Sequence, residues 1–314
     1  MPSLFCSFLI IYSFSVPCLC YYYTILPQNQ LETAAHVFLH HLQVSFSRLN
    51  IICRTWYKLY ASNEIKHRRN IAQCKISDSS ILAMLIWQVS LGIESQRRFC
   101  EHLVNLSHSR FNRRARMLLP LIYRIRHVLN EEVDLSGDIL IIDSFPVPIC
   151  QPVRNCQAKI FSDYANIGYK ATKKTFYYGF KVHAIVSDDG YLLDYAITKA
   201  SVNDARETIE LLVNAQPKNR YLLGDEGYVG KDLHHQLKKM GYILWTPYRK
   251  NMKNAKKHNN HYLMALRRTI ESDFSLLTYY NAENNRARSL TGFQERLEVA
   301  ILAYNMAYCL ERFN

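Results

Sequence analysis

The sequence predicts an α/β protein in which an all-α N-terminal region precedes a five-stranded mixed sheet with flanking helices. Two observations support this prediction. Apolar residues recur at helical spacing before about residue 130, whereas short apolar runs alternate with helical segments from residue 138 onward. A chain of 314 residues is long enough for two domains, each with its own core. We therefore expect an uncharged apolar segment at 1–30, a helical region at 31–134 and an α/β domain at 135–314.

The net charge indicates what kind of partner the protein binds. Lysine and arginine number 39 against 26 acidic residues, which gives a formal net charge of +13. The surplus is divided between residues 32–137 (+7) and residues 138–314 (+6), so it belongs to folded surfaces and not to a basic tail. A broad basic surface favours nucleic acid over an acidic membrane surface, and a soluble basic protein without a polyanionic partner is the alternative.

The first 31 residues contain no Asp, Glu, Lys or Arg. The apolar run from Leu4 to Val16 is too short to span a bilayer, and a secretory signal would need a basic residue earlier than Arg48. Three interpretations stay open: a weak membrane or signal segment, a buried apolar helix, or an upstream extension of the reading frame, which we favour. The nine cysteines form no metal-binding pattern, so we expect reduced thiols in a cytoplasmic protein.

The helical region contains the elements of a DNA-binding module. Residues 77–80 supply caps for a first helix, Gly92 interrupts it, and a second helix is predicted over 94–106. An arginine-rich helix follows, in which Arg113 and Arg114 are our candidates for DNA contacts. Short helices of this kind are typical of a helix-turn-helix DNA binder, and a helical bundle with solvent-facing arginines is the alternative.

After residue 138 the pattern changes from helices to strands. A continuous apolar run is typical of a strand buried on both faces, and strict alternation is typical of a half-buried one. Asp189-Gly190 marks a tight turn between two paired strands. The predicted strands are 139–142, 178–186, 192–198, 221–223 and 242–246; the predicted helices are 204–212 with Asp204 as its cap, 231–240, 261–277 and 293–310.

Three acidic side chains are candidates for one metal site. Asp143 follows the first predicted strand and Asp225 the fourth, so both emerge at one edge of the sheet if these strands are parallel neighbours. Glu271 lies about 100° round its helix from Ile270, at the rim of the face that packs on the sheet. Oxygen-only ligands select hard cations such as Mg²⁺, and two such ions suit an in-line phosphoryl displacement.

Each of these residues also has a purely structural interpretation. Asp143 and Asp225 are typical of turns or caps, and Glu271 of an ion pair with Arg267 or Arg268. Taken singly, the structural interpretations are the more economical. Taken jointly, three carboxylates at one edge of the sheet would repel one another without cations, so a metal site is favoured.

A basic run lies between the fifth predicted strand and the glutamate helix. Residues 249–257 contain no acid and suit contacts with phosphates, with a solvated loop as the alternative. Trp245, just before the run, either stacks on an unpaired base or belongs to the strand core. No glycine-rich nucleotide-binding loop is present in the sequence, so we expect no nucleotide cofactor. The basic residues are Arg249, Lys250, Lys253, Lys256 and Lys257.

Between about residues 138 and 290 the chain carries short motifs in a fixed order. They are Ile142-Asp143-Ser144-Phe-Pro146-Val-Pro148-Ile-Cys150, Tyr177-Tyr-Gly-Phe180-Lys-Val-His183, Ala200-Ser-Val-Asn203-Asp204, Leu223-Gly-Asp225-Glu-Gly-Tyr228, Thr246-Pro-Tyr-Arg249-Lys-Asn-Met-Lys253 and Arg267-Arg-Thr-Ile-Glu271. Together they resemble the motifs of bacterial DDE insertion-sequence transposases, in particular those of the insertion-sequence family numbered 982. The resemblance is weaker over 31–137 and absent before that.

The resemblance implies an RNase H-like catalytic core in which Asp143, Asp225 and Glu271 hold two Mg²⁺ ions, for which Mn²⁺ can substitute. It implies cleavage at the transposon ends, which exposes 3′-hydroxyls, and attack of those hydroxyls on target DNA. The partners it implies are the terminal inverted repeats and target DNA, bound by a homodimer that assembles on DNA. The location it implies is the bacterial cytoplasm, in association with the nucleoid.

The resemblance also bears on further residues. It favours a DNA-facing role for Lys181 and His183, with a structural histidine as the alternative for His183, and we add Arg267 to the DNA-binding set. Relatives typically carry Lys where this chain has Glu226, and many carry a basic residue where it has Thr278. The first departure adds negative charge beside the metals, and the second removes a phosphate contact.

Our prediction is a DNA transposase, a phosphoryl-transfer enzyme that is both nuclease and strand transferase. Three other functions stay open on the sequence. One is a metal-dependent nuclease of the same fold that cuts DNA without joining it. Another is an inactive DNA-binding remnant, motivated by Glu226, Thr278 and the N-terminal segment. The last is a membrane-attached protein, which depends wholly on residues 4–16.

Overall fold

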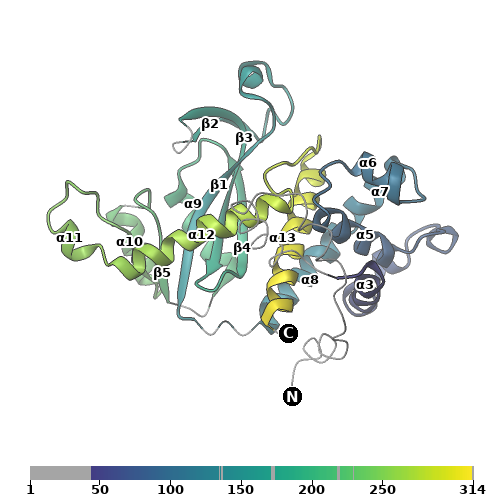
Figure 1. Ribbon diagram of the computed structural model, residues 1–314, viewed down its shortest axis with the longest axis horizontal. Helices are drawn as coiled ribbons and strands as arrows, with labels where there is room; N and C mark the ends of the chain where they lie inside the picture. The colour runs from purple at the N-terminus through teal and green to yellow at the C-terminus, as the bar shows by residue number, and fades with distance from the viewer. Residues whose placement is uncertain are drawn as a thin grey trace, which may run out of the picture. The chain divides into compact units, whose positions relative to one another are not determined.

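The computed structural model describes residues 44–133, 135, 137–170, 174–217, 220–228 and 230–312, without the side chains of residues 311 and 312 (Figure 1). The predictions for residues 1–30 and for the start of the helical region lie outside the described residues. The chain divides into a helical unit, formed by residues up to Val133 and from Glu298 onward, and a sheet unit, Asp134–Leu297. The C-terminal residues therefore belong with the helical unit, whereas the sequence placed them with the sheet.

The helical unit confirms the all-α character of this region. Ser77 caps α5 by accepting the Ser80 amide at 3.1 Å, as the sequence predicts. The arginine-rich segment forms two helices and not one, because Pro120 in the first turn of α8 cannot continue α7. The helices are α3 (Phe46–Tyr60), α4 (Asn63–Lys66), α5 (Asp78–Ser90), α6 (Gln96–Leu103), α7 (His108–Met117), α8 (Leu119–Glu132) and the C-terminal part of α13 (Leu290–Arg312), with a short 3-10 helix at Ile71–Gln73.

The helical unit contains buried ion pairs. The Asp78 carboxylate, at the start of α5, accepts from Arg114 at 2.5 Å and from Arg68 at 2.8 Å. Arg126 and Glu298 form a second buried pair, with 2.7 Å between Nε and Oε1. The prediction that Arg114 contacts DNA is therefore wrong, because its guanidinium is buried and neutralises Asp78.

The sheet unit contains a six-stranded mixed sheet (Figure 1). The strand order is β2-β3-β1-β5-β6, with β4 pairing with β3. The β1–β3, β2–β3 and β3–β4 pairs are antiparallel, whereas β1–β5 and β5–β6 are parallel, so the sheet is mixed as the sequence predicts. All five predicted strands are present, and β2 is an additional one. The strands are β1 (Ile139–Pro148), β2 (Asn166–Lys170), β3 (Thr175–Ser187), β4 (Leu192–Lys199), β5 (Tyr221–Leu223) and β6 (Ile243–Trp245).

Strand β1 is longer than predicted, so Asp143 lies within it and does not follow it. Pro146 and Pro148 argue against a strand in the sequence, because proline cannot donate to a sheet ladder. They are tolerated because β5 pairs with β1 only over Ile139–Ile141, which leaves that edge of β1 open farther along in the described structure.

Helices pack on both faces of the sheet. On one face, the Phe145 ring of β1 lies 4.8 Å from the Phe274 ring of α12, which crosses the strands in Figure 1. Because side chains alternate along a strand, Ser144 points to the other face, where it bonds the first residue of α9. The helices of this unit are α9 (Asp204–Ala215), α10 (Lys231–Lys239), α11 (Ala255–His258), α12 (His261–Tyr279) and the start of α13, with a 3-10 helix at Pro152–Gln157. Within the described ranges, no helix is both long enough and apolar enough to cross a membrane.

Candidate active site

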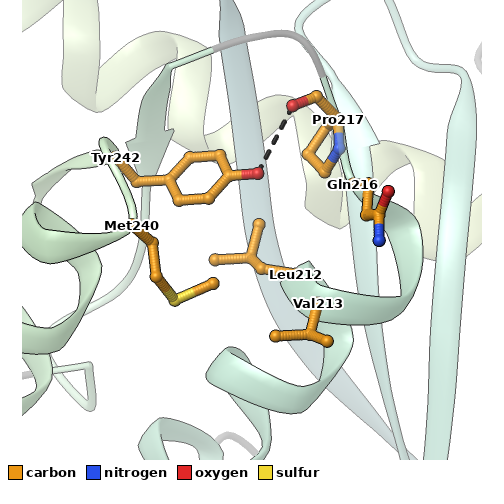
Figure 2. Close-up of a pocket in the computed structure, with 6 residues that line it drawn as sticks. All are labelled: Leu212, Val213, Gln216, Pro217, Met240 and Tyr242. Atoms are coloured by element: carbon orange, nitrogen blue, oxygen red, sulfur yellow. Dashed lines mark hydrogen bonds between the residues drawn. The ribbon is translucent and has the colours of Figure 1, made fainter.

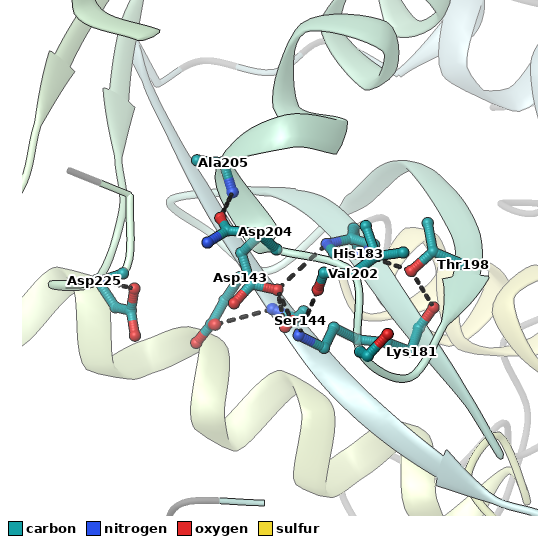
Figure 3. A network of polar contacts seen from close by, with 12 residues as sticks. Asp143, Ser144, Lys181, His183, Thr198, Val202, Asp204, Ala205 and Asp225 are labelled. Atoms are coloured by element: carbon teal, nitrogen blue, oxygen red, sulfur yellow. Dashed lines mark hydrogen bonds and ion pairs between the residues drawn. The ribbon is translucent and has the colours of Figure 1, made fainter. Parts of the chain in front are cut away.

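Asp143 and Asp225 occupy equivalent places on two neighbouring strands. The parallel β1–β5 pair ends with Ile141 opposite Leu223, and each aspartate comes two residues later. The first and fourth predicted strands are therefore parallel neighbours, which is the condition on which the shared site depended. Figure 3 shows the two carboxylates near each other, with Asp143 within β1 and Asp225 just after the end of β5.

A tight turn after β5 fixes Asp225. Its Oδ1 accepts the Gly227 amide at 2.6 Å, and its carbonyl accepts the Tyr228 amide at 3.2 Å. The turn packs the Tyr228 ring against Gly224, where a Cβ would lie only 3.0 Å from that ring. Tyr228 is fully buried, and its hydroxyl has no hydrogen-bond partner among the described residues. A side chain at position 224 would therefore require the Tyr228 ring to shift by a few tenths of an ångström.

The electrostatics at Asp143 are those of a crowded acidic site. Burial and, to a smaller extent, the negative charges of Asp225 and Asp204 raise the pKa of Asp143 to about 7, against the opposing effects of the Ser144 amide and Arg267. Burial also raises the pKa of Tyr228, and the same three aspartates add to that effect. Burial therefore disfavours the ionised forms of both groups, and the neighbouring aspartates add to that effect.

Glu271 lies on α12 but does not join the two aspartates. Its Oε1 accepts from Arg267 Nη2 at 3.1 Å, and its side chain is 64% exposed. Nη1 of the same arginine lies 3.9 Å from Asp143 Oδ2. In the described part of the chain no three His, Cys, Asp or Glu side chains lie close enough together to hold a metal ion. The structure thus brings together two of the three predicted ligands, and the ion pair between Glu271 and Arg267, the alternative weighed above, is present.

A fourth carboxylate, Asp204, belongs to this region and was not among the predicted site residues. The sequence predicts Asp204 as the cap of α9, but Asn203 is the cap, since its side chain accepts the Ala205 amide at 2.9 Å. The Asp204 carboxylate is left to accept from Ser144 Oγ at 2.8 Å and from Lys181 Nζ at 3.2 Å (Figure 3). The only feature of the sequence that could have indicated a site role for Asp204 is the Asn203-Asp204 pair. One residue of such a pair caps the helix, which leaves the other available for a second role.

Lys181 and His183 point inward, toward Asp204. Lys181 Nζ also donates to the Val202 carbonyl at 2.8 Å, and His183 Nε2 lies 2.9 Å from Thr198 Oγ1. Burial lowers the pKa of His183 to about 4, against the opposing effect of Asp204. The prediction that His183 faces DNA is wrong in this structure, because the residue is 1% exposed.

The basic run at 249–257 is exposed, as a DNA-contacting loop must be. Lys250, Lys253, Lys256 and Lys257 all lie at the surface, and exposed Arg249 lies 3.8 Å from Glu226. Glu226, where relatives typically carry Lys, is thus turned toward a basic partner. Of the remaining candidates for DNA contacts, Arg113 on α7 is exposed.

The basic run 249–257 lies on a loop whose two ends are joined by stacked aromatic rings and by the side-chain amide of Asn259. Tyr248 and His258 stack with 3.6 Å between ring centroids, and the Trp245 ring lies nearly parallel to His258 at 5.7 Å. The Asn259 amide accepts from Tyr248 N at 2.7 Å and donates to Tyr248 O at 2.9 Å. Trp245 is half-buried and packs beside His258, and the basic run is presented on a closed loop.

A pocket of about 320 Å³ lies away from these carboxylates (Figure 2). It is found at the C-terminal end of α9, a helix of 12 residues that begins at Asp204 and is about 18 Å long. Tyr242 Oη donates to the Pro217 carbonyl at 3.3 Å beside it. The residues that line it are Leu212, Val213, Gln216, Pro217, Met240 and Tyr242.

Residues 134–306, more than half of the chain, match the family described as "Transposase DDE domain". No curated protein matches the chain. Two solved structures are similar, a Mos1 mariner paired end complex with Mn and a Mos1 transposase paired-end complex with left transposon end. Each is 10% identical to this chain, with a TM-score of 0.25, and the match covers 91% of this chain and 99% of the Mos1 chain.

The match to this family indicates a phosphoryl-transfer enzyme. This chain belongs to the DDE transposase domain family, whose general activity is DNA transposition.

Proposed function

We propose that the protein is an insertion-sequence transposase that cuts DNA at the ends of its element and joins the freed 3′-hydroxyls to target DNA. Asp143, Asp225 and Glu271 are its proposed metal ligands. The observation that carries the proposal is the pair of aspartates at equivalent positions on two parallel strands, in a domain of this family. Strand ends of α/β sheets are where catalytic side chains emerge from a packed core.

The residues present fit divalent cations. The donors are carboxylate oxygens, which hard cations such as Mg²⁺ and Mn²⁺ prefer. Burial, together with the nearby charges of Asp225 and Asp204, raises the pKa of Asp143 to about 7, so a bound cation would favour its ionised form. Arg267 provides one cationic group, between Asp143 and Glu271, and marks where added positive charge is favourable. When bound, two such ions would stabilise charge on the attacking and leaving oxygens of a phosphodiester.

Other groups of the chain hold the proposed metal ligands in place. Asp143 and Asp225 are held in place by backbone amides, from Ser144 at 2.8 Å and Gly227 at 2.6 Å, so little reorganisation is needed for both to bind. Glu271 is exposed on α12, and the proposal requires it to leave Arg267 and turn toward the aspartates when the metals bind. Released Arg267 is then available for a DNA phosphate.

DNA is the proposed partner, both as transposon ends and as target. The closed basic loop and Arg113 offer exposed cations that contact phosphates without sequence preference. Recognition of terminal inverted repeats is assigned to the helical unit, and a homodimer assembled on DNA would bring two ends together. The narrower kinship with the insertion-sequence family numbered 982 rests on the motifs given above.

The experiment that tests the function combines cleavage and strand transfer. The full chain is incubated with a labelled duplex that carries the element's end, a target plasmid, and Mg²⁺ or Mn²⁺. We expect nicked and joined products, and no product from Asp143→Ala, Asp225→Ala or Glu271→Ala, all of which still bind the duplex. Asp232→Ala, which removes an exposed acid from the first turn of α10, is the matched control. Cleavage that survives all three substitutions would remove the mechanism.

The position of Glu271 favours one alternative function. Its exposed side chain and its ion pair with Arg267 are what a DNA-binding remnant without catalysis would have. Such a remnant binds end DNA and cuts it in neither metal. A nuclease of the same fold cuts the duplex and leaves the target plasmid unjoined, so the same assay separates all three. Inverted repeats with short direct duplications beside the gene would support a mobile element.

A further inference from the structure

Asp204 lies next to the proposed catalytic residues on the opposite face of β1. We propose that Asp204 is a positioning residue: it anchors Ser144, and thereby fixes the segment of β1 that carries Asp143. This proposal rests on the proposed metal-binding role of Asp143. Asp204 itself is not proposed as a metal ligand, because Lys181 and Ser144 already occupy one of its oxygens.

The register of the sheet places the partners of Asp204 on one face. Ser144 pairs with His183 across the β1–β3 ladder, and the next residue pair on that face is Pro146 with Lys181. Because side chains alternate along a strand, Asp143 points to the other face, toward α12. Asp204 approaches from α9 and so supports β1 from behind the proposed metal site.

Two donors converge on a single oxygen of Asp204. Ser144 Oγ donates to Oδ1 at 2.8 Å, and Lys181 Nζ lies 3.2 Å from the same atom. Lys181 in turn donates to the Val202 carbonyl at 2.8 Å, two residues before Asp204. The carboxylate is thus held between β1, β3 and the loop that leads into α9, and its side chain is 27% exposed.

Buried His183 limits where Asp204 can move. Its Nδ1 lies 3.5 Å from Asp204 Oδ1 and has no hydrogen-bond partner among the described residues, while its Nε2 lies 2.9 Å from Thr198 Oγ1. A ring fixed in this way fills the space on one side of the carboxylate. Asp204 therefore has one favoured position, in which it contacts Ser144.

Ser144 links Asp204 to Asp143. Its side chain bonds Asp204, while its backbone amide donates to Asp143 Oδ1 at 2.8 Å. Rotation of the peptide at Ser144 would break both bonds, so an anchor on the hydroxyl also orients the amide that holds Asp143. Groups that orient metal ligands in this way typically change metal affinity 10- to 100-fold when removed.

The test measures Mn²⁺ binding to the full chain by calorimetry, together with end cleavage. We expect Asp204→Ala and Ser144→Ala each to weaken Mn²⁺ binding about tenfold or more. Asp204→Asn keeps a carbonyl oxygen that accepts from Ser144, and we expect it to stay within about threefold of the wild type. Asp232→Ala, which removes a first-turn acid from α10, serves as the matched control and binds Mn²⁺ as the wild type does.

Circular dichroism identifies any variant that fails to fold. If Asp204→Ala does not fold, Ser144→Ala, which is the smallest change, still tests the proposal. Wild-type Mn²⁺ affinity in Ser144→Ala would overturn the proposal, and so would equal losses in Asp204→Asn and Asp204→Ala, because charge alone would then explain them. If Asp143→Asn binds Mn²⁺ as tightly as the wild type does, Asp143 is not a metal ligand, and the proposed function fails instead.

Discussion

Arg267 Nη2 lies 3.1 Å from Glu271 Oε1, one turn away on the same helix. Nη1 of this guanidinium lies 3.9 Å from Asp143 Oδ2, so one cation serves two of the three proposed metal ligands. A bound divalent ion would compete with Arg267 for these oxygens. Arg267 therefore couples the electrostatics of the acidic site to the position of Glu271.

Arg267→Gln should make the protein more dependent on divalent cations. Without the guanidinium the carboxylates lose an internal counterion, and we expect the unfolding midpoint in EDTA to fall by several degrees, since a lost bond to a charged group costs about 1.5–3 kcal/mol. Saturating Mn²⁺ should then raise the midpoint more than in the wild type. Arg268→Gln, an exposed neighbour on the same helix, is the control. Identical Mn²⁺ shifts in Arg267→Gln and the wild type would contradict this role.

The raised pKa of Asp143 predicts how stability depends on pH in EDTA. Its ordinary pKa of 3.8 rises to about 7 on folding, so the folded state favours the protonated acid. The stability that this group contributes is complete below about pH 4 and is lost as the pH rises to 7. We expect Asp143→Asn to be more stable than the wild type at pH 8, by on the order of 2 kcal/mol, and similar to it at pH 4. Urea unfolding at both pH values measures the difference, and Asp163→Asn, at an exposed site, should show none.

Tyr228→Phe should stabilise the protein in EDTA. The Tyr228 hydroxyl is buried without a hydrogen-bond partner in the described structure, and such a group costs about 1–3 kcal/mol. Tyr178→Phe is the matched control with the opposite sign, because Tyr178 Oη donates to the Ile160 carbonyl at 2.9 Å. Chemical denaturation should show a gain of about 1 kcal/mol for the first variant and a loss of similar size for the second. A loss in both would mean that Tyr228 has a partner when the protein is in solution.

The closed basic loop should account for part of the salt dependence of DNA binding. Each phosphate contact contributes a slope of about −0.9 to the change of log affinity with log salt. We expect Lys250→Gln and Lys253→Gln each to reduce the magnitude of the slope by up to about this amount, for end DNA and unrelated DNA alike. Lys239→Gln, an exposed lysine in the last turn of α10, is the control for loss of charge alone. Unchanged slopes in both loop variants would exclude phosphate contacts by these lysines.

Adjacent arginines on α7 should behave differently. Arg114 is buried and paired with Asp78, so Arg114→Met leaves a buried charge with less compensation and should cost about 3 kcal/mol of unfolding free energy. Arg113 is exposed, so Arg113→Gln should keep the wild-type stability and weaken DNA binding. Thermal unfolding and a binding titration on the same preparations separate the two effects. A stable Arg114→Met protein would mean that Arg68 alone neutralises Asp78.

The order of the elements and the pair of strand aspartates could be predicted from local patterns. Period-two alternation, apolar runs and turn residues indicate where strands begin. Asp143 follows such a run directly, and Asp225 follows one after a single glycine. Strand β2 and the end of β1 could not be predicted in this way. Pro146 and Pro148 contradict the strand pattern, and they fit only because β5 is too short to pair with them.

The sequence by itself determined the family, the α/β architecture and the identity of the candidate ligands, because these depend on residue type, order and spacing. Only the tertiary structure decided what each charged side chain contacts. It placed Glu271 on Arg267, Arg114 on Asp78, and Lys181 on Asp204. The physical reason is that periodicity reports which face a residue occupies, whereas the partner of a charge depends on which distant segments pack against that face.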